Sequence, residues 1–331
     1  MGSKFPWRVP RARAAGRLDA GHGRWQYLPP PVPGLNYSIS NQAPDLRGAL
    51  FPQPLPVFHE PCEGLVQTDR MRTELVSEPG DPGRPNEDFA SVAVAASGQG
   101  GSLVVLDGVT PPAGGTGCLH SVPWYTARLG GTLTELTVSL PDVPLADALS
   151  RAIALTAARH AETCDLSHPR TPQATVALAR WSPAAVEYLV LSDAALLVES
   201  PGGAVTAVLD DRLSRIPRAA RATDALIDAT LRNKEGGFFT AAADPAVAAR
   251  AVTGVLPRTE VRALAALTDG AARWVETFRE GGWDDCFRFL RKAGARALVD
   301  RVRALERADT DRVFLGRAKT HDDATAVHVE P

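Results

Sequence analysis

The chain has 331 residues, of which 44% are hydrophobic and 22% are charged, with a formal net charge of −2. This composition is ordinary for a globular protein, and the small net charge excludes a general attraction to nucleic acids or anionic membranes. No apolar run approaches the roughly 18 residues needed to cross a bilayer, and the first residues lack a compact secretory segment. We therefore expect a cytoplasmic protein that binds neither nucleic acid nor membrane. The sequence leaves its oligomeric state open.

Residues 1–70 differ from the rest of the chain. Eleven of the 27 prolines fall there, and no sustained apolar period appears. Such a segment buries too little apolar surface to repay its ordering entropy, which predicts a Pro-rich, disordered N-terminal extension. Its first 17 residues are basic, as in a nucleic-acid or membrane tether, but we interpret them as a solvated tail. One folded domain is expected over residues 71–331.

The first half of this domain begins with strands. Short apolar or β-branched stretches between Gly/Pro-rich turns predict strands at residues 72–78, 89–96 and 102–106. Helical spacing follows at residues 122–136 and 145–163. Strand character then returns at residues 174–181, 186–191, 196–199 and 205–209. The tight turns between these last strands suggest an antiparallel meander.

The second half contains mainly helices. Helical patterns are found at residues 219–232 and 245–252, and a strand is expected at residues 261–267. Two more helices, near residues 274–292 and 295–307, precede a last strand at residues 324–329. This order predicts an α+β fold and argues against regular βαβ alternation.

The four cysteines are Cys62, Cys118, Cys164 and Cys286. They lie far apart, with no CxxC pair and no histidine at zinc-finger spacing. We interpret them as reduced thiols.

Acidic residues stand beside four predicted strand ends. Asp107-Gly108 and Asp269-Gly270 end strongly apolar strands, whereas Glu87-Asp88 and Asp322-Asp323 precede strands. A single Asp-Gly pair is more often a turn than a ligand. Together, these ends can bring the acids to one edge of a sandwich. Clustered carboxylates repel each other and persist only if cations neutralise them, and oxygen ligands suit Mg²⁺ or Mn²⁺.

Six short motifs occur in a characteristic order: Asn86-Glu87-Asp88, Leu106-Asp107-Gly108, Ala174-Thr175-Val176-Ala177, Leu191-Ser192-Asp193, Leu267-Thr268-Asp269-Gly270 and Asp322-Asp323-Ala324-Thr325. This order resembles the successive motifs of the PP2C-type (PPM) protein phosphatases over about residues 71–331. The resemblance implies a four-layer αββα sandwich, in which two antiparallel sheets are flanked by helix pairs. It also implies a site for two Mg²⁺ or Mn²⁺ ions.

The resemblance implies roles for individual residues. Asp107 would bridge the two ions, and the Gly108 carbonyl would bind one of them. Asp269 and Asp322 would complete the other ion's site, while Glu87 and Asp88 would hold metal-bound waters or ligate directly. The implied activity is hydrolysis of phosphomonoesters, with phosphoserine or phosphothreonine in a phosphorylated protein substrate, by a metal-activated water.

The match departs from the family pattern at three places. Gly83 stands where many members have a phosphate-binding arginine, so Arg84 is the candidate for that role. Val109 cannot donate a proton to the leaving group, which leaves water, His120 or His321. Asp323 replaces the usual asparagine, where its charge would either tighten metal binding or face solvent.

Two other functions are alternatives to a PP2C-type phosphatase. The altered positions Gly83 and Val109 slightly favour a catalytically weak member that binds a phosphoprotein or a regulator. The retained acids count against it. The stretch around Asp107 also resembles haloacid-dehalogenase-like phosphatases, but their mechanism requires an aspartate at the position of Val105.

Overall fold

The computed structural model describes residues 71–331, apart from residues 96–98, 112–113 and 317. The predicted N-terminal extension and Cys62 lie outside these residues. No helix in the described part of the chain is both long enough and apolar enough to span a bilayer.

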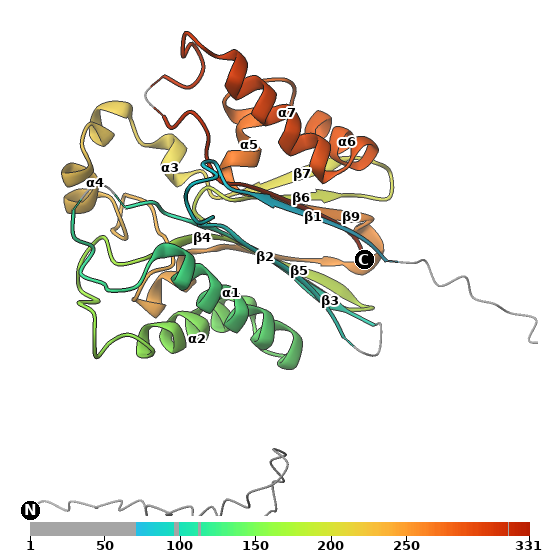
Figure 1. Ribbon diagram of the computed structural model, residues 1–331. Coiled ribbons are helices and arrows are strands. Elements are labelled where there is room, and N and C mark those ends of the chain that lie inside the picture. Colours follow the sequence, from blue (N-terminus) through green and yellow to red (C-terminus); the bar gives the residue numbers. More distant parts are fainter. Residues whose placement is uncertain (1–70, 96–98, 112–113, 317) are drawn as a thin grey trace, which may run out of the picture. The chain divides into compact units, whose positions relative to one another are not determined.

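Two five-stranded antiparallel sheets form the centre of the domain (Figure 1). The first sheet contains, in spatial order, β1 (Arg72–Glu78), β10 (Ala324–Glu330), β9 (Ala263–Leu267), β6 (Ala195–Glu199) and β7 (Val205–Leu209). The second contains β2 (Phe89–Val94), β3 (Gly101–Gly108), β4 (Ala174–Trp181), β5 (Ala185–Leu191) and β8 (Val252–Pro257).

Helices cover the outer face of each sheet (Figure 1). The second sheet packs against α1 (Val122–Ser139) and α2 (Leu145–Ala158). The first sheet packs against α5 (Asp269–Glu276), α6 (Trp283–Ala293) and α7 (Ala295–Ala308). The short helices α3 (Arg212–Arg215) and α4 (Asp224–Thr230) lie between β7 and β8 in the chain. The α+β class and the sandwich of two antiparallel sheets are therefore confirmed.

Alternating side chains of β3 explain why its sequence is apolar throughout. Leu103 and Val105 face the core between the sheets, whereas Val104 and Leu106 face α1 and α2. All four side chains are fully buried. A strand with both faces covered needs apolar residues at every position, because successive side chains point to opposite faces.

The predicted meander of three or four strands is wrong. Strands β4 and β5 pair in the second sheet, whereas β6 and β7 pair in the first. The chain passes from one sheet to the other after β5, where Ser192 adopts a φ of 66°. Alternation of side chains identifies strands but does not say which sheet a strand joins.

Some predicted helix ends are also wrong. The helix expected at residues 274–292 is two helices, because α5 ends at Glu276 and α6 begins only at Trp283, after Gly281 and Gly282. Helix α2 ends at Ala158, five residues earlier than expected. In place of one helix at residues 219–232, the structure has a 3₁₀ turn, Arg218–Arg221, followed by α4.

Strand β8 was missed. The helix expected at residues 245–252 is a 3₁₀ helix, Pro245–Arg250, followed by this strand. β8 is an edge strand with Val252 and Val255 exposed, so it lacks the alternation of a half-buried strand.

Candidate metal centre

Strand register places the acidic motifs at one end of both sheets. In the second sheet, Phe89 pairs with Leu106 and Val176 pairs with Leu191, so the acids before β2, at the end of β3 and after β5 share one end. In the first sheet, Leu267 pairs with both Ala195 and Ala326, which puts the acids after β9 and before β10 at one end too.

Hydrogen bonds join these two strand-end groups across the sandwich. The backbone N–H of Asp269 donates to Asp107 Oδ2 at 3.3 Å. The hydroxyls of Thr268 and Thr325 donate to Asp88 Oδ2 at 3.0 and 2.7 Å. The structure thus brings Asp88 and Asp107 of the second sheet together with Asp269 of the first.

Burial and mutual repulsion raise the pKa values of these carboxyl groups. Burial is the largest cause for Asp107, whose pKa lies well above its usual value; charge on Asp269 and Asp88 adds to it. Burial likewise raises the pKa of Asp88 to about 8 and that of Asp269 to about 7, although the threonine hydrogen bonds act to lower the former. Without a cation, the site therefore favours protonated carboxyl groups.

Two further acids interact electrostatically with this group. The pKa of Asp193 is raised chiefly by burial, and its charge raises the pKa values of Asp107 and Asp269. Burial, followed by the charges of Asp193 and Asp269, raises the pKa of Glu276 to about 7. The sequence motif contained Asp193 without marking it as a site residue. Hereafter, the carboxylate cluster means Asp88, Asp107, Asp193, Asp269 and Asp322.

Two glycines let backbone segments meet beside the cluster. A Cβ atom at Gly108 would lie 2.4 Å from the Glu87 carbonyl oxygen, and one at Gly270 would lie 2.0 Å from the Asp323 carbonyl oxygen. Both distances are far below van der Waals contact. Each Asp-Gly pair therefore needs its glycine for packing across the site.

Asp322 is held by two cationic side chains, Lys319 and Arg273. Lys319 Nζ donates to Asp322 Oδ1 at 2.8 Å and to Thr110 Oγ1 at 2.7 Å, while Arg273 contacts Asp322 Oδ2 at 3.1 Å. Burial acts to lower the pKa of Lys319, but the hydrogen bond and charge of Asp322 outweigh it and raise that pKa. The Thr110 hydroxyl donates in turn to Glu87.

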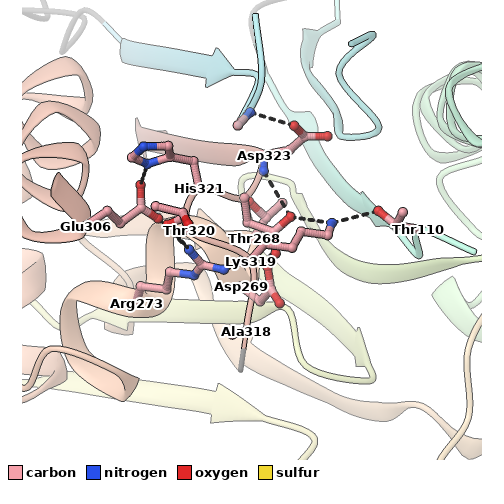
Figure 2. A network of polar contacts seen from close by, with 12 residues as sticks. Thr110, Thr268, Asp269, Arg273, Glu306, Ala318, Lys319, Thr320, His321 and Asp323 are labelled. Atoms are coloured by element: carbon pink, nitrogen blue, oxygen red, sulfur yellow. Dashed lines mark hydrogen bonds and ion pairs between the residues drawn. The ribbon is translucent and has the colours of Figure 1, made fainter. Parts of the chain in front are cut away.

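A buried ion-pair network fixes Arg273 in this position. Glu306, which is 1% exposed, accepts from Arg273 at 2.5 Å and from Arg303 at 2.8 Å. His321 Nδ1 lies 2.7 Å from the same carboxylate (Figure 2). This network ties the segment before β10 to α7.

Asp323 is half-buried, and its carboxylate is engaged by the backbone. Its two carboxylate oxygens accept the backbone N–H groups of Gly80, at 2.8 Å, and Glu87, at 2.6 Å. These two hydrogen bonds show that the extra charge orders the segment that leads to Asp88. Its effect on metal binding stays a prediction.

The other candidate residues lie as follows. Arg84 is exposed and lines a cavity of about 40 Å³ with Glu87, Lys319, His321 and Asp322. Such a volume holds at most a few waters or ions. His120 instead lies beside Cys118 and Cys164, so His321 is the candidate proton donor that lines this cavity.

Two of the described cysteines meet in space. The described cysteines Cys118, Cys164 and Cys286 are free, as expected for reduced thiols. However, Cys118 and Cys164 have two histidines beside them, His120 and His160. Neither Cys118-x-His120 nor His160-x₃-Cys164 has zinc-finger spacing, so the sequence did not predict this group.

The carboxylate cluster fits a hard divalent cation. Asp88 Oδ1 is buried and, among the described residues, has no hydrogen-bond partner. A buried carboxylate oxygen without a partner is costly unless a cation neutralises it. The donors are all oxygens, which Mg²⁺ and Mn²⁺ prefer. In Asp322, by contrast, Lys319 and Arg273 already engage both oxygens.

A family model described as protein phosphatase 2C matches residues 81–304. The chain belongs to the protein phosphatase 2C family. Two solved structures are similar to it. The serine/threonine phosphatase Stp1 from Staphylococcus aureus has 13% identity and a TM-score of 0.50, covering 79% of this chain and 95% of Stp1. A bacterial serine phosphatase has 14% identity and a TM-score of 0.50, covering 78% and 97%. At such identity these two structures show the shared fold alone. No curated protein matches the sequence.

Proposed function

We propose that the chain is a metal-dependent phosphatase that hydrolyses phosphomonoesters, with phosphoserine or phosphothreonine in proteins as its substrates. The main support is the buried meeting point of Asp88, Asp107 and Asp269 between the two sheets, with Asp88 Oδ1 unpartnered among the described residues. Membership of the protein phosphatase 2C family supports phosphate-ester hydrolysis as the reaction at this site.

Six residues would hold the cations: Glu87, Asp88, Asp107, Gly108 through its carbonyl, Asp269 and Asp322. Asp193, at the same end of the sheets, adds a further carboxylate. Two bound Mg²⁺ or Mn²⁺ ions would lower the pKa of water and offset charge on the phosphoryl oxygens.

The chain's own residues position these groups. Thr268 and Thr325 fix one oxygen of Asp88, which leaves Oδ1 free to ligate. Lys319 holds Asp322 Oδ1 and therefore competes for this carboxylate with any cation. Lys319 and Arg84 line the same small cavity, so both can contribute positive charge toward phosphoryl oxygens.

A large groove beside the cluster supports a protein substrate. Its volume is about 1170 Å³, and its lining includes Asp193, Val109, Phe238 and Phe314. Pockets for small ligands usually have volumes of about 300–1,000 Å³. This groove is large enough for a peptide segment around the phosphorylated residue.

The test is hydrolysis of p-nitrophenyl phosphate and of a phosphothreonine peptide by the full chain. We expect turnover that requires Mn²⁺ or Mg²⁺, is lost on chelation, and is abolished in Asp107→Asn. Asp300→Asn, which changes an exposed carboxylate on α7, is the matched control and should retain turnover. Activity that survives chelation, or that is unchanged in Asp107→Asn, would contradict the proposal.

A second candidate is a phosphoprotein-binding module with little turnover. It is favoured by Asp322, whose two oxygens are already held by Lys319 and Arg273, and by the aliphatic Val109. It predicts that a phosphothreonine peptide binds equally well with and without Mn²⁺ and is not hydrolysed. Turnover that depends on Mn²⁺ rejects it.

A further inference from the structure

A second group of metal-binding side chains lies at the ends of the helical pair α1–α2. The Cys/His cluster comprises Cys118 and His120, just before α1, and His160 and Cys164, just after α2. One ligand atom from each residue lies within 4.8 Å of every other. Nothing in the carboxylate chemistry described above uses these four side chains.

The distances suit tetrahedral coordination. With bonds of about 2.3 Å to sulfur and about 2.0–2.1 Å to nitrogen, the donors of a tetrahedral zinc site lie roughly 3.3–3.8 Å apart. The Sγ–Nδ1 distances are 3.3 Å for Cys118–His160, 3.4 Å for Cys164–His120 and 3.7 Å for Cys118–His120. The two sulfurs are closer, at 3.0 Å, but are not bonded to each other.

The surroundings orient these donors inward. His160 is 2% exposed, and the only hydrogen bond that its ring makes within the described residues is between Nδ1 and the Cys118 sulfur, a weak partner. The His120 ring stacks on Trp124, with centroids 4.0 Å apart, and Trp124 also contacts the His160 ring edge-on at 5.3 Å. Trp124 therefore fixes both imidazoles.

The backbone closes around the sulfurs. The N–H of Leu119 donates to Cys164 Sγ at 3.3 Å, and the N–H of His120 donates to Cys118 Sγ at 3.4 Å. The loop that carries Cys118 is joined to the loop that carries Cys164, because Asp165 N–H donates to the Gly117 carbonyl at 2.7 Å. Gly117 has a φ of 69°, which permits this tight approach.

We propose that Cys118, His120, His160 and Cys164 bind one structural zinc ion. Two thiolates and two imidazoles in a closed set of four are a typical structural zinc site, whereas oxygen-rich sites hold Mg²⁺ or Mn²⁺. The ion joins the segment that enters α1 to the segment that leaves α2. This site does not rest on the proposed phosphatase activity.

The experiment is metal analysis of the untagged full chain produced with zinc in the medium. We expect about one zinc per chain, retained after dialysis, and a loss of at least tenfold in bound zinc in Cys118→Ser and Cys164→Ser. Two control variants should keep their zinc. Cys286→Ser changes a buried cysteine of α6, and Asp107→Asn changes the carboxylate cluster.

A second measurement keeps the test decisive if the cysteine variants fail to fold. Cobalt(II) exchanged into the wild-type chain should give the visible absorption of tetrahedral Co²⁺ and thiolate-to-metal charge transfer, and Zn²⁺ should displace it. Titration of the native thiols with a mercurial should release zinc in proportion to the thiols modified. A native chain without zinc, with Cys118 and Cys164 either free or joined in a disulfide, would overturn the proposal. So would zinc that is lost in Asp107→Asn but kept in Cys118→Ser.

Discussion

The two candidate metal sites are assembled in different ways. The carboxylate cluster draws oxygen donors from strand ends in both sheets, and hydrogen bonds from Thr268 and Asp269 cross the sandwich to complete it. The Cys/His cluster draws sulfur and nitrogen donors from two loops at the ends of α1 and α2. The first depends on how the sheets pack and the second on how one helical pair closes, so each can be perturbed separately.

The largest effect is expected from a substitution in the carboxylate cluster, which should lower activity without changing the zinc content. Asp107→Asn removes a charged oxygen donor from the carboxylate cluster while leaving its shape nearly unchanged. We expect at least about a 100-fold loss in Mn²⁺-dependent hydrolysis, because changes merely beside metal ligands already cost 10–100-fold. Steady-state kinetics with p-nitrophenyl phosphate measure it. Zinc content should stay constant, and a parallel loss of zinc would show that the sites are not independent.

The next effect concerns pH and stability. An aspartate has a pKa of about 3.9 when unfolded, whereas in the folded chain the pKa of Asp88 is about 8 and that of Asp269 about 7. Between the unfolded and the folded pKa values, the folded state binds more protons than the unfolded state. The free energy of unfolding therefore falls as pH rises from about 5 to 8. Below this window, the lowered pKa values of Glu74, Asp285 and Asp309 act in the opposite direction.

Added Mg²⁺ should reverse this loss. At 100 times its Kd a ligand stabilises the folded state by about 2.7 kcal/mol, which corresponds to roughly 5–10 °C in a domain of this size. Thermal unfolding at pH 6 and pH 8, with and without Mg²⁺, measures the effect. The gain should be larger at pH 8, where the carboxylates are ionised, and much smaller in Asp88→Asn. A gain that is equal at both pH values would count against a cation at this cluster.

A smaller effect is expected at Asp323. Asn retains only one acceptor oxygen, so Asp323→Asn leaves either the Gly80 or the Glu87 N–H without its partner. We expect a loss of about 1 kcal/mol in the free energy of unfolding, the usual contribution of one hydrogen bond. Urea unfolding measures it. An unchanged midpoint would mean that these two hydrogen bonds add nothing to stability.

The smallest effect is expected at Lys319, which is about half exposed. Lys319→Gln removes a cation that competes for Asp322 Oδ1. Exposed ion pairs contribute about 0.2–1 kcal/mol, so the half-saturating Mn²⁺ concentration should fall by at most about fivefold. A manganese titration of activity measures this concentration. Lys234→Gln is the control, because Lys234 contacts the Asp228 carbonyl and not Asp322. A rise in the Mn²⁺ requirement would contradict competition.

The sequence predicted much of the carboxylate site because sheet geometry limits where strand ends can lie. Asp107 lies at the end of β3 and Asp269 follows β9, and an antiparallel pair places the end of one strand beside the start of its partner. The start of β2 therefore lies beside the end of β3, and the start of β10 beside the end of β9. The passage of the chain from the second sheet to the first after Leu191 could not be predicted. Alternation of apolar and polar side chains carries no information about which strand pairs with which. Lys319 and Arg273 also escaped detection, since their link to Asp322 is formed by the packing of α5 and the segment before β10.

The Cys/His cluster was missed for a different physical reason. Its two halves are separated by the whole α1–α2 pair, so only the closure of that pair brings Cys118 to Cys164. Helical periodicity predicted both helices but extended the second to residue 163, through His160. In the structure α2 ends at Ala158, and the turn that follows frees His160 to face Cys118.

Anomalous scattering from a crystal grown with Mn²⁺ and Zn²⁺ would test the account most directly. Data at the manganese and zinc absorption edges identify each ion by element and position. We predict manganese between Asp107 and Asp269 and a single zinc among Cys118, His120, His160 and Cys164. Absence of manganese at the carboxylate cluster in a crystal soaked at high Mn²⁺ concentration would contradict the account, whatever the zinc edge reveals.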